Sequence, residues 1–278
     1  MEPKNLLSIF ENTKDILCRY DYYVQTSKRI FKITNTEDRI PHLMGLQYIG
    51  PKGKYTGDKG TYLIKKKKLK YSSIEKCIRK YYKGTEKQNS ALAMVYGKID
   101  NLYRIRELFS SEAAIYLYEK VLNPDSELDT DYLLVCELQE IVIQIGIVAA
   151  GKGAEKVYHC NTFLIDYRSN NDYDLHYRNL KVRHDIRKVT RQEKMTGISK
   201  VTYLSEEAAS RERIGINKML KEAGKACPEE LVEALLKLNC ASGQYHTIDM
   251  INKLDVSETG SDVEYQNAIK NVLDLWEK

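Results

Sequence analysis

The segment 140–150, which reads EIVIQIGIVAA, constrains the fold more than any other part of the chain. Its isoleucines at 141, 143, 145 and 147 alternate with other residues, and this period of two places them on one face of a β-strand. We expect the isoleucine face to pack against helices. Gln144 and Gly146 are then expected on the opposite, more open face.

Three further extended runs lie around this strand, separated from it and from one another by turn-forming or polar residues. They are AAIYLYEKV (113–121), DYLLVCEL (131–138) and KVYHCNTFLIDY (156–167). Short runs rich in β-branched and aromatic residues at this spacing are typical of an antiparallel meander. We therefore predict about four antiparallel strands between residues 113 and 167. In the last run the alternation leaves open which face is buried.

The N-terminal part is predicted to be largely helical. Apolar residues at helical spacing indicate one amphipathic helix over 3–19 and a longer helix over 90–109, whereas 22–33 reads as extended chain. Residues 72–75 have the S-x-x-E form of a capping box, which predicts the start of another helix. The glycine-rich stretch 50–70 ends in four consecutive lysines, Lys65 to Lys68, and a mobile basic loop is expected there.

The last part of the chain changes character twice. Residues 169–199 hold many charges and few apolar residues, which predicts a linker or an exposed helix. Ser205, Pro228 and a capping box at 261–264 are helix-start signals, so 200–278 is expected to be a helical domain. A plain bundle fits these helices better than a helix-turn-helix DNA reader, because their spacing specifies no recognition residues.

The predicted fold class is therefore α+β. We expect N-terminal helices packed on a small antiparallel four-stranded sheet within residues 1–168, followed by the linker and the helical C-terminal domain. With 278 residues and 42% hydrophobic content, the chain is able to bury a sizeable core in one large or two modest domains.

Charge and hydropathy limit the partners of the protein. Lysine and arginine number 44 against 39 acidic residues, and the net charge of +5 fits either a polyanionic partner or a well-solvated surface. No apolar run approaches the roughly 18 residues that a membrane helix needs. We therefore expect a cytoplasmic protein that has no membrane partner.

Several common catalytic motifs are absent from the sequence. It has no G-x-x-x-x-G-K-[ST] loop, no G-x-G-x-x-G segment, no G-x-S-x-G elbow and no H-E-x-x-H pair. The six cysteines lie far apart without a C-x-x-C pair, which indicates reduced thiols and no zinc site. Asp172, Asp174 and His176 fit an Asn/Asp-rich turn better than a metal site. We expect neither a metal nor another cofactor.

One histidine stands between a proline and an apolar run, in the segment RIPHLMGLQ (39–47). A buried imidazole costs free energy unless its nitrogens find partners. His42 therefore either bonds to backbone carbonyls at a helix start or belongs to a functional site.

Four segments, taken in order, resemble a known family. They are PHLMGLQYI (41–49), KIDNLYRIRELF (98–109), DYLLVCELQEIVIQIGI (131–147) and VYHCNTFLID (157–166). This ordered set resembles the fourth subgroup of the phage-associated nucleases that are grouped with barnase, EndoU, colicin-type and RelE-like ribonucleases. The resemblance covers about residues 15–168 and implies an RNase-like fold.

The resemblance also implies where a catalytic site would lie. His42 falls on the histidine position of the subgroup and is expected to face a cleft, with Lys98 as a basic residue at the start of the second segment. Thr162 falls where the family tends to have a serine or threonine on the last strand, and Tyr158 matches an aromatic residue just before it. These four residues are the predicted catalytic set, with Thr162 read alternatively as an ordinary strand residue.

A second set of residues is expected to bind RNA. Arg104 and the lysines Lys65, Lys66, Lys67 and Lys68 supply positive charge for phosphate groups, although such a lysine run also occurs in solvated loops. Gln144 stands where many relatives of the family have a histidine. Because of Gln144 and Thr162, the resemblance implies the fold more strongly than it implies catalysis.

Two functions follow as hypotheses. The first is a metal-independent endoribonuclease, a phage or mobile-element toxin or defence effector, in which the RNA 2′-hydroxyl attacks the adjacent phosphate. The alternative is a catalytically inactive nuclease-like protein that binds nucleic acid or a protein partner, for example a phage-encoded inhibitor. The expected partners are RNA and an antitoxin or inhibitory protein, and the helical C-terminal part is a candidate dimerisation or regulatory module. The sequence does not set the oligomeric state.

Overall fold

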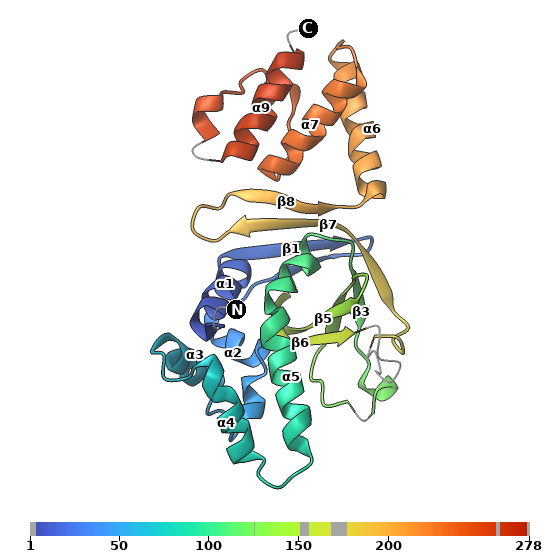
Figure 1. The fold of residues 1–278 in the computed structure, drawn as a ribbon. Helices are drawn as coiled ribbons and strands as arrows, with labels where there is room; N and C mark the ends of the chain where they lie inside the picture. Colours follow the sequence, from blue (N-terminus) through green and yellow to red (C-terminus); the bar gives the residue numbers. More distant parts are fainter. Residues whose placement is uncertain (1–3, 125, 151–155, 168–176, 260–261, 277–278) are drawn as a thin grey trace.

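The computed structural model describes residues 4–124, 126–150, 156–167, 177–259 and 262–276 (Figure 1). The strands are β1 (Tyr20–Thr26), β2 (Ile30–Ile33), β3 (Ala114–Leu117), β4 (Tyr132–Glu137), β5 (Ile141–Ala150), β6 (Val157–Tyr167), β7 (Arg183–Glu193) and β8 (Ser199–Leu204). The α-helices are α1 (Leu6–Leu17), α2 (Ile40–Leu43), α3 (Gly57–Lys65), α4 (Tyr71–Tyr81), α5 (Lys87–Asn101), α6 (Glu206–Glu222), α7 (Glu229–Ser242), α8 (Ile248–Ile251) and α9 (Val263–Trp276). Short 3₁₀ helices are η1 (Glu37–Arg39), η2 (Leu46–Ile49), η3 (Leu102–Phe109), η4 (Lys120–Leu122) and η5 (Val256–Thr259).

The strands form one mixed sheet that closes on itself. Its order is β1-β2-β6-β5-β4-β3-β7, and β1 also pairs with β7, so that seven strands make a ring. Strand β8 flanks the ring by pairing with β7. Strands β2 and β6 pair in parallel, and the other pairs are antiparallel.

The predicted fold class is therefore wrong in its sheet. The expected antiparallel order of β3, β4, β5 and β6 is present, but these are four of the eight strands of the sheet. The additional strands come from the extended segment 22–33, which supplies β1 and β2, and from the charged segment after residue 180, which supplies β7 and β8. The small four-stranded sheet with helices packed on it is thus replaced by a closed, larger sheet.

Strand β7 lies in the segment that the sequence assigns to a linker or an exposed helix. Its buried residues, His184, Ile186 and Val189, face inward, and the charged residues between them face outward. A half-buried strand with one polar face needs only a few apolar side chains. The low apolar content of this segment therefore reflects burial on a single face.

The two faces of the central strands have different surroundings. The isoleucines of β5 belong to the main core together with residues of α1, α5 and η3, as predicted. The other face carries a smaller cluster that includes Val142, Leu133, Tyr116 and Tyr177. The expectation of an open face at Gln144 is wrong, because Gln144 is fully buried.

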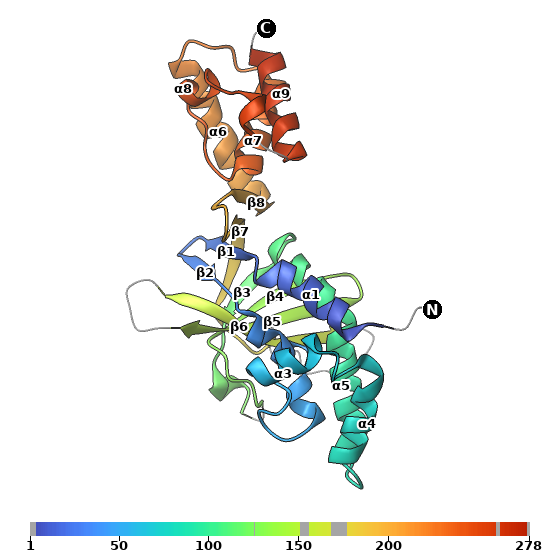
Figure 2. The same cartoon turned by 90° about the vertical axis from the view of Figure 1, so that its left-hand side faces the viewer.

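The helical N-terminal segments lie along one side of the ring (Figures 1 and 2). Helix α1 packs against η3, and α2 and α5 contact β6. The helix expected over 90–109 begins at Lys87 and changes to the 3₁₀ helix η3 after Asn101. Helix α3 occupies 57–65, where a mobile basic loop was expected.

The C-terminal helices form a separate packing unit. Helices α6, α7, α8 and α9 surround a core that includes Leu220, Leu238 and Val272. This unit lies beyond β8, at the end of the molecule away from α3, α4 and α5 (Figures 1 and 2). Helix α7 contacts β8, so the flanking strand connects the unit to the ring. Among the described residues, no helix combines the length and the apolar character that crossing a membrane requires.

The burial of β7 predicts a contrast between two neighbouring alanine substitutions. Ile186 is 3% exposed inside the ring, so Ile186→Ala is expected to lower the free energy of unfolding by about 2–5 kcal/mol. Val182 is 36% exposed just before the strand, and Val182→Ala is expected to change the free energy of unfolding by less than about 0.5 kcal/mol. Urea unfolding of both variants measures the contrast. Equal and small changes in the free energy of unfolding would contradict the burial of β7 and support the interpretation of residues 183–193 as a linker.

Candidate functional site

His42 lies on a short helix whose two ends are set by the local sequence. Pro41 occupies the first turn of α2, where its fixed φ angle suits a helix start and its missing N–H is not needed. The helix ends at Leu43, and Gly45, two residues later, turns the chain with φ = +77°, a left-handed conformation that favours glycine. Leu43 and Met44 are fully buried and anchor this turn in the main core. The imidazole of His42 is thereby held half-buried at a fixed place.

Lys98 approaches the same turn from α5. Its side chain packs over Gly45, where a Cβ atom would lie 3.1 Å from Lys98 Cδ. The Lys98 Nζ atom lies 5.6 Å from the centre of the Tyr48 ring, a cation–π contact. Lys98 is only 4% exposed, which is rare for a lysine. Gly45 is therefore needed both for the backbone conformation of the turn and for the close approach of Lys98.

Electrostatics tie Lys98 to His42. The pKa of His42 is lowered to about 4, mainly by burial and in addition by the positive charges of Lys98 and Arg39. Burial also lowers the pKa of Lys98 to about 8. Within the described part of the chain, no carboxylate forms a salt bridge with Lys98 and no group hydrogen-bonds to the His42 imidazole. The alternative of a histidine satisfied by backbone carbonyls thus finds no support among these residues.

We call His42, Lys98, Tyr48 and Gly45 the His42–Lys98 site. At neutral pH it combines a neutral imidazole, which is able to accept a proton, with a protonated ammonium group, which is able to donate one. A buried ammonium without a counter-charge favours an anion close to it. The site therefore holds a proton acceptor and a cationic proton donor, and because Lys98 is only 4% exposed, contact of a phosphate with its ammonium group requires the covering residues to move.

The structure does not bring the other two predicted catalytic residues into this site. Thr162 lies on the face of the sheet opposite the helices, where a Cβ atom at Gly146 would come within 2.7 Å of its Cγ2. Tyr158 lies on the inner face with Phe31 and Tyr132, at ring-centre distances of 5.3 and 5.8 Å. Their catalytic roles stay predictions that draw no support from contact with His42 or Lys98.

The predicted RNA-binding residues are scattered. Lys65 is held by Glu37, with Nζ 2.6 Å from Oε1, whereas Lys66, Lys67 and Lys68 are exposed at the end of α3. Gln144 donates its amide to Asp166 Oδ2, and its own Oε1 is buried with no partner among the described residues. Because Gln144 is fully buried, contact with RNA would require the covering residues to move.

Arg104 is held in η3 in a partly buried position. Its guanidinium group lies 5.3 Å from the centre of the Tyr103 ring. Its Nε atom is buried and has no hydrogen-bond partner among the described residues. Arg104 thus keeps a free donor, and its predicted contact with RNA stays a prediction.

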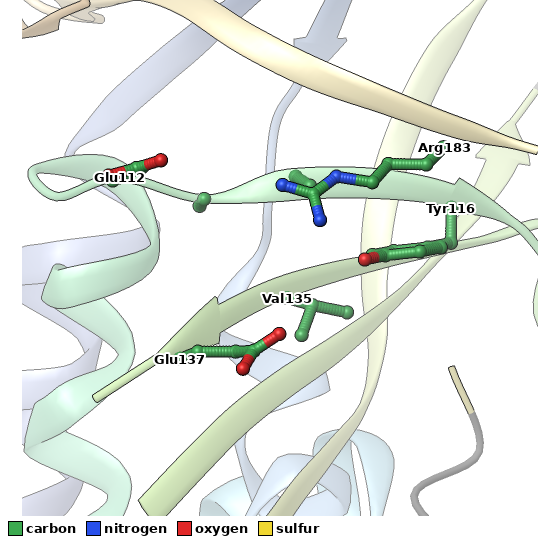
Figure 3. Close-up of a pocket in the computed structure, with 7 residues that line it drawn as sticks. Glu112, Tyr116, Val135, Glu137 and Arg183 are labelled. Carbon is green, nitrogen blue, oxygen red and sulfur yellow. The ribbon is translucent and has the colours of Figure 1, made fainter. Parts of the chain in front are cut away.

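A pocket of about 230 Å³ opens on the opposite face of the sheet (Figure 3). Glu112, Glu137 and Arg183 surround it, with Tyr116 and Val135 alongside. The Nε atom of Arg183 lies 2.7 Å from Asp185 Oδ1, so its charge is already compensated. An acidic pocket of this kind repels phosphate, and we do not place the site there.

Sequence reasoning found His42 and Lys98 but missed the groups that shape their environment. Tyr48 and Arg39 flank His42 in the same sequence segment, so their proximity along the chain was the available signal. In the described ranges, no group of three His, Cys, Asp or Glu side chains is placed to hold a metal ion. The segment with Asp172, Asp174 and His176, read as a turn, lies outside those ranges.

Comparison with known proteins gave one match. A family model described as "phage-Barnase-EndoU-ColicinE5/D-RelE like nuclease4" matches residues 5–212. No curated protein and no solved structure matches the chain. The family match confirms the resemblance found in the sequence and extends it through β7 and β8 into α6.

The proximity of the two site residues predicts a coupled titration. Lys98→Met removes a positive charge beside His42 and is expected to raise the His42 pKa from about 4 toward its ordinary value, but not fully, because burial is the larger cause. Nuclear magnetic resonance titration of the imidazole protons measures this change. Lys66→Met, which removes an exposed charge, is the control and is expected to leave the His42 pKa unchanged. An equal His42 pKa in wild type and Lys98→Met would show that the charge of Lys98 does not act on His42.

Proposed function

Because the chain belongs to the family of phage-Barnase-EndoU-ColicinE5/D-RelE like nucleases, we propose that it is an endoribonuclease that acts at the His42–Lys98 site without a metal ion. The observation that carries the proposal is a neutral, half-buried imidazole beside a buried lysine with no described carboxylate partner. A phosphodiester group would supply the missing negative charge. The net charge of +5 favours the approach of a polyanion.

Each residue has a defined part in the proposed reaction. His42 accepts the proton of the RNA 2′-hydroxyl, and the 2′-oxygen attacks the adjacent phosphorus atom. The bond from phosphorus to the 5′-oxygen breaks, and Lys98 donates a proton to that oxygen. Lys98 also stabilises the negative charge on the phosphate during the attack. The products are a 2′,3′-cyclic phosphate and a 5′-hydroxyl end.

The two pKa values are suited to these parts. A general base must be deprotonated at the working pH, and the lowered pKa of His42 ensures this near pH 7. A general acid must be protonated and yet give up its proton readily, and a lysine with a pKa of about 8 meets both conditions. The different environments of His42 and Lys98 thus make the first a general base and the second a general acid.

A second candidate function follows from the opposite face of the sheet. Gln144, which stands where the family resemblance leads us to expect a histidine, is fully buried and bonded to Asp166. If the reaction depended on that position, the protein would be an inactive nuclease-like binder of nucleic acid or of a protein, such as a phage-encoded inhibitor. As an active nuclease it would instead serve as a phage or mobile-element toxin or defence effector in the cytoplasm, with an antitoxin or inhibitory protein as partner.

Cleavage of bulk RNA in excess chelator tests the first function. We expect the wild-type protein to cleave and to leave cyclic phosphate ends, and His42→Ala to be slower by a factor of about 10²–10⁴ because the general base is lost. Lys98→Met is expected to lose activity by a similar factor, whereas the matched charge removal Lys66→Met is expected to retain it. Circular dichroism verifies that each variant is folded. Absence of cleavage by the wild type at stoichiometric concentration would favour the inactive binder.

The proposed roles also predict a bell-shaped dependence of kcat/KM on pH. The rate constant is expected to rise as His42 loses its proton near pH 4 and to fall as Lys98 loses its proton near pH 8. Lys98→Arg keeps the charge but titrates above pH 12, so its remaining activity is expected to lack the alkaline decrease. The assignment of Lys98 as the acid is contradicted if wild type and Lys98→Arg lose activity at the same alkaline pH.

A further inference from the structure

Several strand ends meet at one end of the closed sheet. The β1–β2 turn lies here, because Gln25 pairs with Ile30. The starts of β6, β4 and β7 lie at the same end, as their registers with the neighbouring strands show. Figure 2 shows the β1–β2 hairpin at this edge of the sheet. We call the side chains gathered here the hairpin-end cluster: Lys28, Arg29, Tyr132, Tyr158 and His184.

Arg29 is fixed in this cluster by aromatic rings. Its guanidinium carbon lies 4.3 Å from the centre of the Phe31 ring and 4.6 Å from the centre of the Tyr132 ring. The Tyr158 ring lies 5.3 Å from Phe31 and completes the aromatic surround. Stacking of this kind holds the guanidinium plane and leaves its N–H edges as directed donors. A salt bridge from Arg29 to a carboxylate is not found among the described residues.

Two further basic groups lie close to Arg29. Lys28 is exposed on the β1–β2 turn. His184 is buried at the start of β7, where burial lowers its pKa most, the charges of Lys28 and Arg29 lower it further, and the charge of Asp185 opposes them. Asp131 lies at this end as well, but its Oδ2 accepts the Ala149 N–H, at 2.6 Å. The cluster thus gathers two cations, Lys28 and Arg29, that form no salt bridge among the described residues, although the carboxylates of Asp131 and Asp185 lie near it.

This combination fits a phosphate better than a carboxylate. Arg29 and Lys28 come from the β1–β2 turn and His184 from β7, and several donors gathered from separate segments suit the tetrahedral oxygens of a phosphodiester. A planar carboxylate would engage the guanidinium fork alone.

We propose that the hairpin-end cluster binds a second phosphodiester of the RNA strand whose cleavage is assigned to the His42–Lys98 site, an inference that rests on the proposed function. Strand β6 connects the two places, because its second residue is Tyr158 of the cluster and α2, which carries His42, contacts the strand. The substrate class is then a polynucleotide that extends along β6, and a single nucleotide would occupy only one of the two phosphate positions. Arg29 and Lys28 are binding residues in this scheme and take no part in the reaction.

Binding of a short 2′-O-methyl RNA oligonucleotide tests the inference. This probe lacks the attacking hydroxyl, so the full-length protein binds it without cleaving it. We expect Arg29→Gln and Lys28→Ala each to weaken binding, Arg29→Gln by about tenfold. Loss of one phosphate contact on a single strand is also expected to reduce the slope of log K against log salt by about 0.7. Arg211→Gln is the control, since it removes one exposed charge from α6, where Arg211 pairs with Glu207.

The outcomes separate this inference from the proposed function. Binding by Arg29→Gln and Lys28→Ala with wild-type affinity and salt slope overturns the inference, even if the wild type cleaves RNA. The same holds if Arg211→Gln loses as much affinity as they do, or if the wild type does not bind the probe. Weakened binding by the cluster variants, in a protein that cleaves nothing, supports the inference and contradicts the nuclease proposal. If Arg29→Gln does not fold, the exposed Lys28→Ala variant decides.

Discussion

The structure depends on the pairing of β7 with three other strands. Residues 183–185 pair with β3, 186–193 pair with β1, and 188–192 pair with β8 on the edge shared with β3. The first two pairings close the ring and enclose the main core, in which Val24 and Val189 meet fully buried. The third connects the C-terminal helices to the ring through β8. A single strand near residue 190 therefore determines both the shape of the sheet and the position of the helical unit.

Closure of the ring leaves polar groups in two environments with different consequences. In the helical layer, the ammonium group of Lys98 is buried beside His42, an arrangement that costs stability until a negative charge arrives. At the hairpin end, aromatic rings hold Arg29 near the surface, where its donors are already oriented. Under the two proposals, a ligand with repeated negative charges would occupy both places at once. The acidic pocket near Glu112 and Glu137 would not attract such a ligand. The two faces of the sheet therefore differ in charge.

Much of the local structure followed from the sequence because it depends on neighbouring residues alone. The alternation at 141–147 placed the isoleucines on the core face, and apolar spacing predicted α1. The segment 41–45 could be connected to His42 because a proline, a histidine and a glycine in this order have local roles. Lys98 was found through the family resemblance, and the helix that carries it was within the predicted range. By contrast, the contacts of Arg29 and His184 depend on strands that are about 150 residues apart, which no local pattern encodes.

The sequence by itself determined the nuclease family and most of the strand-forming and helix-forming segments, and it nominated His42 and Lys98 as candidate site residues. Only the tertiary structure decided that the sheet closes, because closure requires the charged strand β7 to pair with β1 across the length of the chain. It also decided that Gln144 is buried, that Thr162 lies on the face opposite the helices, and that Lys98 reaches His42 over a glycine. The reason is physical: periodicity along a chain sets which face of an element is apolar, whereas long-range packing sets what that face meets.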